Sequence, residues 1–259
     1  MKKLLNLPER AKKPREKGLT HVLDKALGIT AQGDILSTCA YYIDIVKIGW
    51  GLGVLVPHLE EKIELYHKHK IPVTFGGTLF EVVYAEGKID EYKNWLKELG
   101  IKYMEISDGT ITLTISEKLD LIKEFSKDFT VLSEFGSKDA ATIVAPKEWV
   151  LGMIMELDAG AWKVIAEGRE SGTSGLYRRS SEIRTGLVDE IVDAIDHQRI
   201  IWEAPQKAQQ VWFIKEFGPN VNLGNIAPAE ILPLETLRLG LRGDTLETFH
   251  VTSNREQES

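Results

Sequence analysis

The sequence contains a single cysteine, Cys39, so no disulfide can form within the chain. It has no apolar run approaching the ~20 residues that a membrane-spanning helix needs, and its first residues lack the apolar stretch of a signal peptide. Because disulfides mark oxidising compartments, we expect a cytoplasmic protein with no membrane partner. Cys39 stands in the apolar stretch LSTCAYYI, where packing in the core is expected rather than a reactive thiol.

Surplus positive charge is also missing, since the formal net charge is −7. A protein that binds nucleic acid needs basic residues to displace counterions from phosphates, so we expect no nucleic-acid partner. The spacings typical of a zinc site, a Ser-His-Asp triad or a P-loop do not occur either. These absences leave a soluble enzyme or an interaction domain.

Eight short apolar runs, each followed by turn residues, indicate β-strands. They are LTHVLD (19–24), IDIVKIG (43–49), IPVTFGG (71–77), IKYMEIS (101–107), FTVLSEFG (129–136), WKVIAEG (162–168), IIWEAP (200–205) and NVNLGNI (220–226). Helical patterns lie between and after them, at 57–70, 116–128, 146–160, 180–196, 206–218 and 228–243. Ser116 is expected to cap the second of these helices, and Pro146 to begin the third.

This alternation of strands and helices predicts an α/β fold, a single-domain (β/α)8 TIM barrel. A doubly wound open sheet is the alternative, but eight strands without a nucleotide-binding glycine fingerprint favour closure. We expect the barrel over residues 18–243, with a basic N-terminal arm at 1–17 and a polar C-terminal tail at 244–259.

Charged residues stand late in several strands, although parallel strands covered on both faces should be apolar. They are Asp24, Lys47, Glu105, Glu134, Glu167 and Glu203. A buried carboxylate is costly unless it is paired or bound to a metal. Because the carboxyl ends of barrel strands form the active site in this fold, we expect these side chains to converge on one mouth.

Cations occur at the same ends, where Lys138 and Arg169 follow the fifth and sixth strands. Mixed carboxylates and cations suit an anionic substrate held partly through a divalent metal, and an oxygen-rich set favours Mg²⁺ over zinc. The alternative is a polar layer in which these charges only pair with each other. Asp139 could hold Lys138 in place or could only begin the following helix.

Glycine-rich turns at these ends are a further sign of anion binding, because backbone amides at helix starts can cradle phosphate. Gly76 and Gly77 precede a helical segment, and GRESGTSG (168–175) follows the sixth strand. Gly224 and Asn225 belong to the eighth strand, near which phosphate sites of this fold often lie. Ordinary tight turning is the alternative for each of them.

Taken in order, the loop motifs resemble those of the phosphosulfolactate synthase family. They are PREKGLT (14–20), DIVKIGWG (44–51), FGGTLFE (75–81), EISDGT (105–110), LSEFGSKDA (132–140), EGRESGTSG (167–175), WEAP (202–205), GPNVNLGNI (218–226) and LETLRLGLRGDT (234–245). The family usually has Phe where Ile48 stands and Thr where Leu52 stands. If that Thr contacts substrate, Leu52 removes a hydrogen bond.

The resemblance implies a Mg²⁺-dependent (β/α)8 lyase that adds sulfite to C3 of phosphoenolpyruvate, giving (2R)-2-O-phospho-3-sulfolactate. In methanogenic archaea this product leads toward coenzyme M, whereas bacterial relatives are thought to make sulfolactate. The enolate-like intermediate needs positive charge near the substrate oxygens and a proton donor at C2.

The resemblance and the strand-end positions together assign roles. Three carboxylates are expected to hold Mg²⁺: Glu105, Glu134 and Glu167. Lys138 is the expected general acid, with a pKa lowered by neighbouring cations. Lys47 and Arg169 are expected to pair with phosphate, carboxylate or sulfite. Glu203 is expected either to bind the metal or to orient a lysine.

Two other functions remain open at this stage. One is a different Mg²⁺ barrel enzyme that stabilises a phosphoenolpyruvate-derived enolate. The other is a non-catalytic protein, as some plant relatives associated with heat stress could be, although a scaffold has no need of so many buried charges. Because barrels often associate through their outer helices, we also expect a homo-oligomer.

Overall fold

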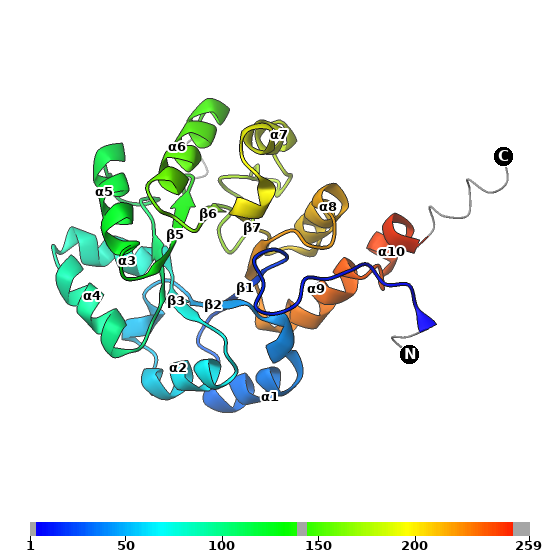
Figure 1. The fold of residues 1–259 in the computed structure, drawn as a ribbon, viewed down its shortest axis with the longest axis horizontal. Coiled ribbons are helices and arrows are strands. Elements are labelled where there is room, and N and C mark those ends of the chain that lie inside the picture. The colour runs from blue at the N-terminus through cyan, green and yellow to red at the C-terminus, as the bar shows by residue number, and fades with distance from the viewer. Residues whose placement is uncertain (1–3, 139–143, 251–259) are drawn as a thin grey trace.

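The computed structural model describes residues 4–138 and 144–250 of the chain, so Asp139 lies outside the described residues (Figure 1). All eight predicted strands are confirmed. They are β1 (Thr20–Asp24), β2 (Ile45–Ile48), β3 (Val73–Phe75), β4 (Tyr103–Ile106), β5 (Thr130–Phe135), β6 (Lys163–Ala166), β7 (Ile200–Glu203) and β8 (Leu223–Ile226).

The strands form one parallel sheet in the order β3-β2-β1-β8-β7-β6-β5-β4. Its two end strands, β3 and β4, approach each other within 8 Å between Cα atoms, so the sheet is a nearly closed barrel. Helices surround it (Figure 1). The predicted (β/α)8 architecture is therefore confirmed, and the open doubly wound sheet is excluded.

The outer layer contains more helices than the sequence patterns indicated. The helices are α1 (Ile29–Cys39), α2 (Leu59–Lys68), α3 (Gly77–Ala85), α4 (Ile89–Glu98), α5 (Ile115–Phe125), α6 (Pro146–Asp158), α7 (Thr185–Ala194), α8 (Lys207–Phe217), α9 (Ile231–Arg238) and α10 (Gly243–His250). Helix α4 was not predicted, although Tyr92 and Leu96, four residues apart, are buried on its inner face. Within the described part of the chain, every helix is too short or too polar to span a membrane.

Helix α10 begins where the sequence indicated a polar tail. Thr245 in its first turn is fully buried, and its hydroxyl donates to the Leu237 carbonyl of α9 at 2.7 Å. The remainder of the expected tail, 251–259, lies outside the described residues.

One of the two predicted helix starts is confirmed. Pro146 is the first residue of α6, where a missing N–H does no harm. The cap predicted at Ser116 is wrong, because Thr114 caps α5: the Glu117 N–H donates to Oγ1 of Thr114, and the Thr114 N–H donates to the Glu117 carboxylate. This reciprocal pair is a capping box, which satisfies two helix-end donors at once.

The barrel interior is built in layers because successive side chains of a strand point to opposite faces. An apolar layer fills its lower part: Leu19, Ile45, Leu132, Ile165 and Ile201. The residue two positions further along most of these strands points inward again, closer to the carboxyl end. Those residues are Lys47, Glu134, Glu167 and Glu203, so the charged layer lies directly above the apolar one.

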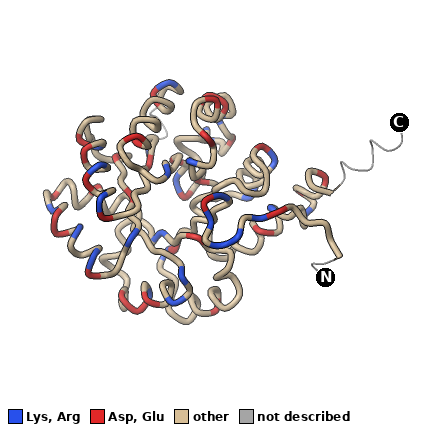
Figure 2. The backbone as a smooth tube through the Cα atoms, viewed as in Figure 1, with Lys and Arg blue, Asp and Glu red and all other residues tan. Residues whose placement is uncertain are grey.

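Cys39 is buried with the residues that pack between the sheet and the helices, as predicted. On the outer helices, positions of both charge signs are interspersed (Figure 2).

Candidate active site

A cavity of about 240 Å³ opens at the carboxyl ends of the strands. All the predicted site residues except Glu105 and Gly224 line it: Lys47, Gly76, Gly77, Glu134, Lys138, Glu167, Arg169, Glu203 and Asn225. Leu23, Trp50, Thr78, Thr110 and Glu170 complete the lining. The structure therefore brings together side chains that are up to 178 positions apart in the chain, from Lys47 to Asn225.

Lys47 reaches into the cavity from β2. Its Nζ lies 3.1 Å from Oε1 of Glu203 and 3.5 Å from Oε2 of Glu105. Burial alone would lower the pKa of Lys47, but the two carboxylates raise it above its ordinary value. The other Glu203 oxygen accepts from the Gly168 N–H at 2.9 Å, so Glu203 contacts both Lys47 and the loop after β6.

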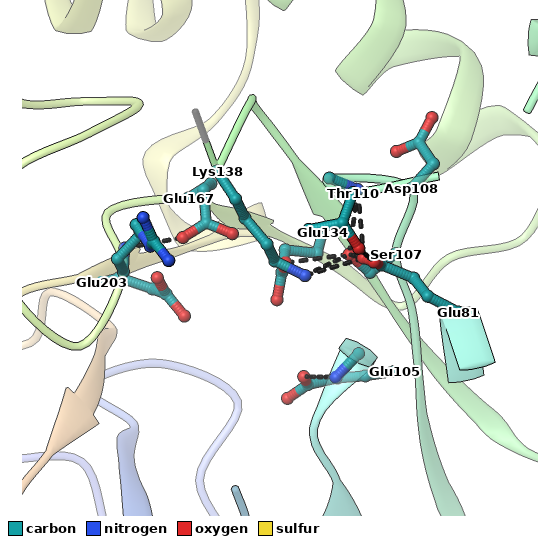
Figure 3. A network of polar contacts seen from close by, with 12 residues as sticks. Glu81, Glu105, Ser107, Asp108, Thr110, Glu134, Lys138, Glu167 and Glu203 are labelled. Carbon is teal, nitrogen blue, oxygen red and sulfur yellow. Dashed lines mark hydrogen bonds and ion pairs between the residues drawn. The ribbon is translucent and has the colours of Figure 1, made fainter. Parts of the chain in front are cut away.

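Lys138 stands at the rim among oxygen atoms. Its Nζ lies 2.7 Å from Oε1 of Glu81, 2.9 Å from Oγ of Ser107 and 3.0 Å from Oε1 of Glu134 (Figure 3). Burial alone would lower the pKa of Lys138, but Glu134 and further carboxylates raise it above its ordinary value. The predicted lowered pKa is therefore wrong, because the groups facing this amine are anions and not cations.

Glu134 and Glu167 are both buried, yet their environments differ. Burial raises the pKa of each carboxyl. Around Glu134 the charges of Lys138 and Lys47 outweigh burial, and its pKa falls below the ordinary range. Glu167 faces the negative charges of Glu134 and Glu203, so its pKa rises well above the ordinary value.

The free oxygen of Glu167 bears on metal binding. Its Oε1 accepts from the Arg169 N–H at 2.6 Å, whereas its buried Oε2 accepts no hydrogen bond in the described part of the chain. The neighbouring group is the Glu134 carboxylate, to which a protonated Glu167 donates a hydrogen bond. A carboxyl in this position, beside other carboxylates, needs either a proton or a cation. The described residues contain no group of three or more His, Cys, Asp or Glu side chains that could together hold a metal ion. Mg²⁺ is usually held by one or two carboxylates together with waters and substrate oxygens, so Glu134 and Glu167 fit such a site.

Glu105 lies deeper than the cavity. Its Oε2 accepts from the Gly77 N–H at 3.0 Å, and its Oε1 lies 3.5 Å from Nε2 of His21. Burial raises the pKa of Glu105 to about 7, against the opposing charge of Lys47. Like Oε2 of Glu167, Oε1 of Glu105 accepts no hydrogen bond in the described part of the chain. Glu105 differs from Glu167 in lying outside the lining of the cavity.

Asp24 does not join the other strand-end acids, so the expectation that all of them face one mouth is wrong for this residue. Its Oδ2 lies 2.6 Å from Nζ of Lys62 and accepts from the Tyr66 hydroxyl at 2.7 Å. The last residue of β1 points outward, and its charge is satisfied by α2.

The predicted glycines occupy tight places. Gly76 donates its N–H to the Ile48 carbonyl at 2.9 Å, as Gly77 does to Glu105, so these two amides are already used. A Cβ at Gly77 would lie 2.4 Å from Cβ of Ser107, so this close packing leaves no room for a side chain at position 77. Gly224 packs against Ile201 and His21 inside the barrel. Asn225 lines the cavity with a positive φ of 55°, and its buried Oδ1 has no hydrogen-bond partner among the described residues.

Leu52, where the family usually has Thr, does not line this cavity. It lines a separate cavity with Leu27 and Leu55 and packs against the residues between sheet and helices. In this structure the Leu52 side chain therefore removes no hydrogen bond from the site.

Sequence reasoning missed Glu81, Ser107 and Thr110. Glu81 is 1 % exposed and accepts hydrogen bonds from both Ser107 and Thr110. The signal was an acid inside the apolar run LFEVVYA of α3, which resembles the strand-end acids in being charged where burial was expected.

Comparisons with known proteins identify the family of the chain. The family described as (2R)-phospho-3-sulfolactate synthase (ComA) matches residues 8–244. A phosphosulfolactate synthase of Bacillus subtilis is 45% identical over 244 residues, covering 93% of this chain and 97% of that protein. One from Methanothermobacter thermautotrophicus is 42% identical, covering 92% and 95%.

Among solved structures, 3-hexulose-6-phosphate synthase from Salmonella typhimurium superposes with a TM-score of 0.54 at 13% identity. The match covers 84% of this chain and 96% of that one. At this identity the likeness supports the barrel fold alone. The sequence matches span nearly the whole chain, and on them we conclude that this protein belongs to the (2R)-phospho-3-sulfolactate synthase (ComA) family.

Proposed function

We propose that the protein adds sulfite to C3 of phosphoenolpyruvate and releases (2R)-2-O-phospho-3-sulfolactate. The observation that carries this proposal is the cavity at the barrel mouth, in a chain of this family, where Lys47, Lys138 and Arg169 meet the carboxylates. Its volume of about 240 Å³ suits small anions. Both substrates are multiply charged anions, so three cations at one cavity match their chemistry.

We assign substrate binding to cations that lie at different depths in the cavity. Lys47 is almost fully buried and Arg169 is exposed at the mouth, so an anion with two charged ends can contact both. An arginine fork suits the oxygens of phosphate, sulfite or carboxylate. The amides of Gly76 and Gly77 are occupied, so we assign them a steric role, which lets α3 begin against Trp50 and Ser107.

The reaction needs charge stabilisation and one proton. The sulfur lone pair forms the new bond to C3, and the C2–C3 π electrons move toward the substrate carboxylate. A proton at C2 then completes the product, with no bond to phosphate broken. Lys138 is the proposed donor: its carboxylate neighbours keep it protonated through the neutral range, so the proton is present when C2 becomes basic.

We propose that Mg²⁺ is held by Glu134 and Glu167, with Glu105 as a supporting residue beneath them. The unpaired Oε2 of Glu167 and the carboxylate-only donor set support this choice. When bound, the metal supplies positive charge for the oxygens on which negative charge develops. Glu203 then acts by orienting Lys47.

The test is purified protein with phosphoenolpyruvate, sulfite and Mg²⁺, with each component omitted in turn and the products followed by ³¹P NMR. We expect a phosphorylated, sulfonated product only when all three are present. Consumption of phosphoenolpyruvate without sulfite would favour another enolate-stabilising barrel enzyme, and no consumption at all would favour a non-catalytic protein.

A cytoplasmic location and a homo-oligomeric state are also proposals. The single buried cysteine supports a reducing compartment, and sedimentation of the purified protein would give the assembly. Whether the product continues toward coenzyme M or sulfolactate depends on the enzymes that accompany this one.

A further inference from the structure

Glu81 is a buried carboxylate of α3 that stands behind the cavity wall rather than in it. Its Oε1 lies 2.6 Å from Oγ of Ser107, 2.7 Å from Nζ of Lys138 and 3.1 Å from the Gly109 nitrogen. Its Oε2 accepts from the Thr110 hydroxyl (Figure 3). One side chain thus binds the lysine at the cavity rim and three residues of the loop after β4.

That loop packs against the stem of the same lysine. A Cβ placed on Gly109 would lie 2.8 Å from Cγ of Lys138, so the loop backbone touches the aliphatic part of the side chain. A lysine ammonium has three donors and no acceptor. Glu81, Ser107 and Glu134 supply three acceptors, which together fix the position of Nζ.

The three acceptors around Nζ of Lys138 differ in charge and in their position relative to the cavity. Glu134 lines the cavity and faces whatever binds there, and Ser107 is neutral. Glu81 does not line the cavity, so its charge stays with the lysine whether or not the cavity is filled. The Thr110 hydroxyl donates to the other oxygen of this carboxylate, and the Gly109 N–H donates to Oε1 beside the lysine, so the position of the carboxylate is itself fixed.

We infer that Glu81 is a positioning residue that holds the Lys138 ammonium at the cavity, acting through Lys138 and touching no substrate. The inference rests on the proposed function for its kinetic consequence. A long, flexible lysine is useful as a proton donor only if Nζ stays within reach of the reacting carbon.

The decisive experiment is a double-mutant cycle on the purified full chain. We expect Glu81→Gln to lower kcat for sulfite addition roughly 10- to 100-fold, the loss typical of a misplaced catalytic group, with little change in either KM. In a Lys138→Ala background the same substitution should have almost no further effect, because the two residues act as a unit. An equal loss in both backgrounds would show a merely structural Glu81 and overturn the inference.

Glu64→Gln is the matched control. Like Glu81, Glu64 pairs with a lysine. Its partner is Lys68 of the same helix, at 3.2 Å, and both side chains are about two-thirds exposed. Its kcat should equal that of the unsubstituted protein. If Glu81→Gln does not fold by circular dichroism, Glu81→Asp replaces it. This variant keeps the charge with a shorter reach, and an unchanged kcat would again overturn the inference.

A second measurement separates this inference from the proposed function. Acetylation of Lys138 by acetic anhydride, followed by peptide mass spectrometry, should be several-fold faster in Glu81→Gln, because the ammonium is less firmly held. An unchanged rate would contradict the positioning role. If the unsubstituted protein shows no sulfite-dependent consumption of phosphoenolpyruvate, the proposed function fails, while the acetylation rate still decides how Lys138 is held.

Discussion

Glu134 and Glu167 have the same side chain and are both buried in one cavity, yet their carboxyl pKa values shift in opposite directions. The difference comes from the nearest charges: ammonium groups beside Glu134, and carboxylates beside Glu167. At the residue scale, therefore, function depends on which neighbours a buried charge has. One of the two carboxyls is ionised and already paired, and the other still needs a proton or a cation.

Lys138→Ala tests the proposed proton donor. We expect kcat to fall by about 10²- to 10⁴-fold, the usual contribution of general acid catalysis, measured by steady-state consumption of phosphoenolpyruvate with sulfite. Lys123→Ala, an exposed lysine of α5, serves as the control. Near-normal turnover in Lys138→Ala would remove this residue from the mechanism.

Glu134→Gln tests the proposed metal site. The amide keeps the shape of the side chain and removes its charge, so a higher Mg²⁺ concentration should be needed for half-maximal activity. Titration of activity against Mg²⁺ measures this. A curve that superposes on that of the unsubstituted protein would reject Glu134 as a ligand.

At the scale of elements, buried ion pairs connect the helices to the strand ends that carry the site. Nζ of Lys118, in α5, lies 2.8 Å from Oδ1 of Asp108, in the loop after β4, and 2.8 Å from Oε1 of Glu156, in α6. It also donates to the Glu134 carbonyl at 2.8 Å. Lys62 of α2 does the same for Asp24 at the end of β1. These pairs hold the loops on which the site residues stand.

Lys118→Met should therefore destabilise the protein by about 3 to 5 kcal/mol, because it leaves the buried Glu156 without its partner. Urea unfolding followed by circular dichroism measures the loss. Lys118→Met combined with Glu156→Met should recover part of it, since both buried charges are then gone. A double variant less stable than the single one would contradict this explanation.

The amino end of β6 gives a prediction for pH. Burial lowers the pKa of Lys163 to about 8, and its Nζ donates to the Gln198 carbonyl at 2.7 Å. Between pH 8 and the ordinary lysine value of about 10.5 the unfolded chain holds more protons, so stability rises with pH across this window. Relative to Lys163→Met, the unsubstituted protein should gain on the order of 1 kcal/mol between pH 8 and 10, discounted for solvent near the amine. If the difference in unfolding free energy between the unsubstituted protein and Lys163→Met is the same at pH 8 and pH 10, this prediction is wrong.

At the scale of the whole molecule, the two faces of the barrel divide stability from chemistry. The cavity lies at the carboxyl ends of the strands, and residues 10–15 of the N-terminal arm pack at the other face. There Arg15 is buried against Asp44, with 3.0 Å between Nη1 and Oδ1, and Arg10 bonds Glu235 of α9. The predicted arm is thus tied to the barrel by ion pairs.

Arg15→Met should cost about 3 to 5 kcal/mol of stability, because Asp44 stays buried without its partner, while KM for both substrates stays unchanged. Thermal unfolding and steady-state kinetics on the same sample check both parts. Lys12→Met, an exposed neighbour in the arm, is the control. A changed KM without a lower Tm would contradict the division between the two faces.

The sequence by itself determined the barrel and most residues of the cavity, because strand periodicity and the carboxyl-end rule are local patterns. A charged side chain two positions beyond an inward-facing apolar residue of the same strand must also point into the barrel interior. Only the tertiary structure decided how those charges pair. Lys47 meets Glu203 across 156 positions, Asp24 turns to α2, and Glu81 reaches Lys138 from a helix. A buried charge takes its pKa and its role from neighbours in space, and the packing of the elements alone sets those distances.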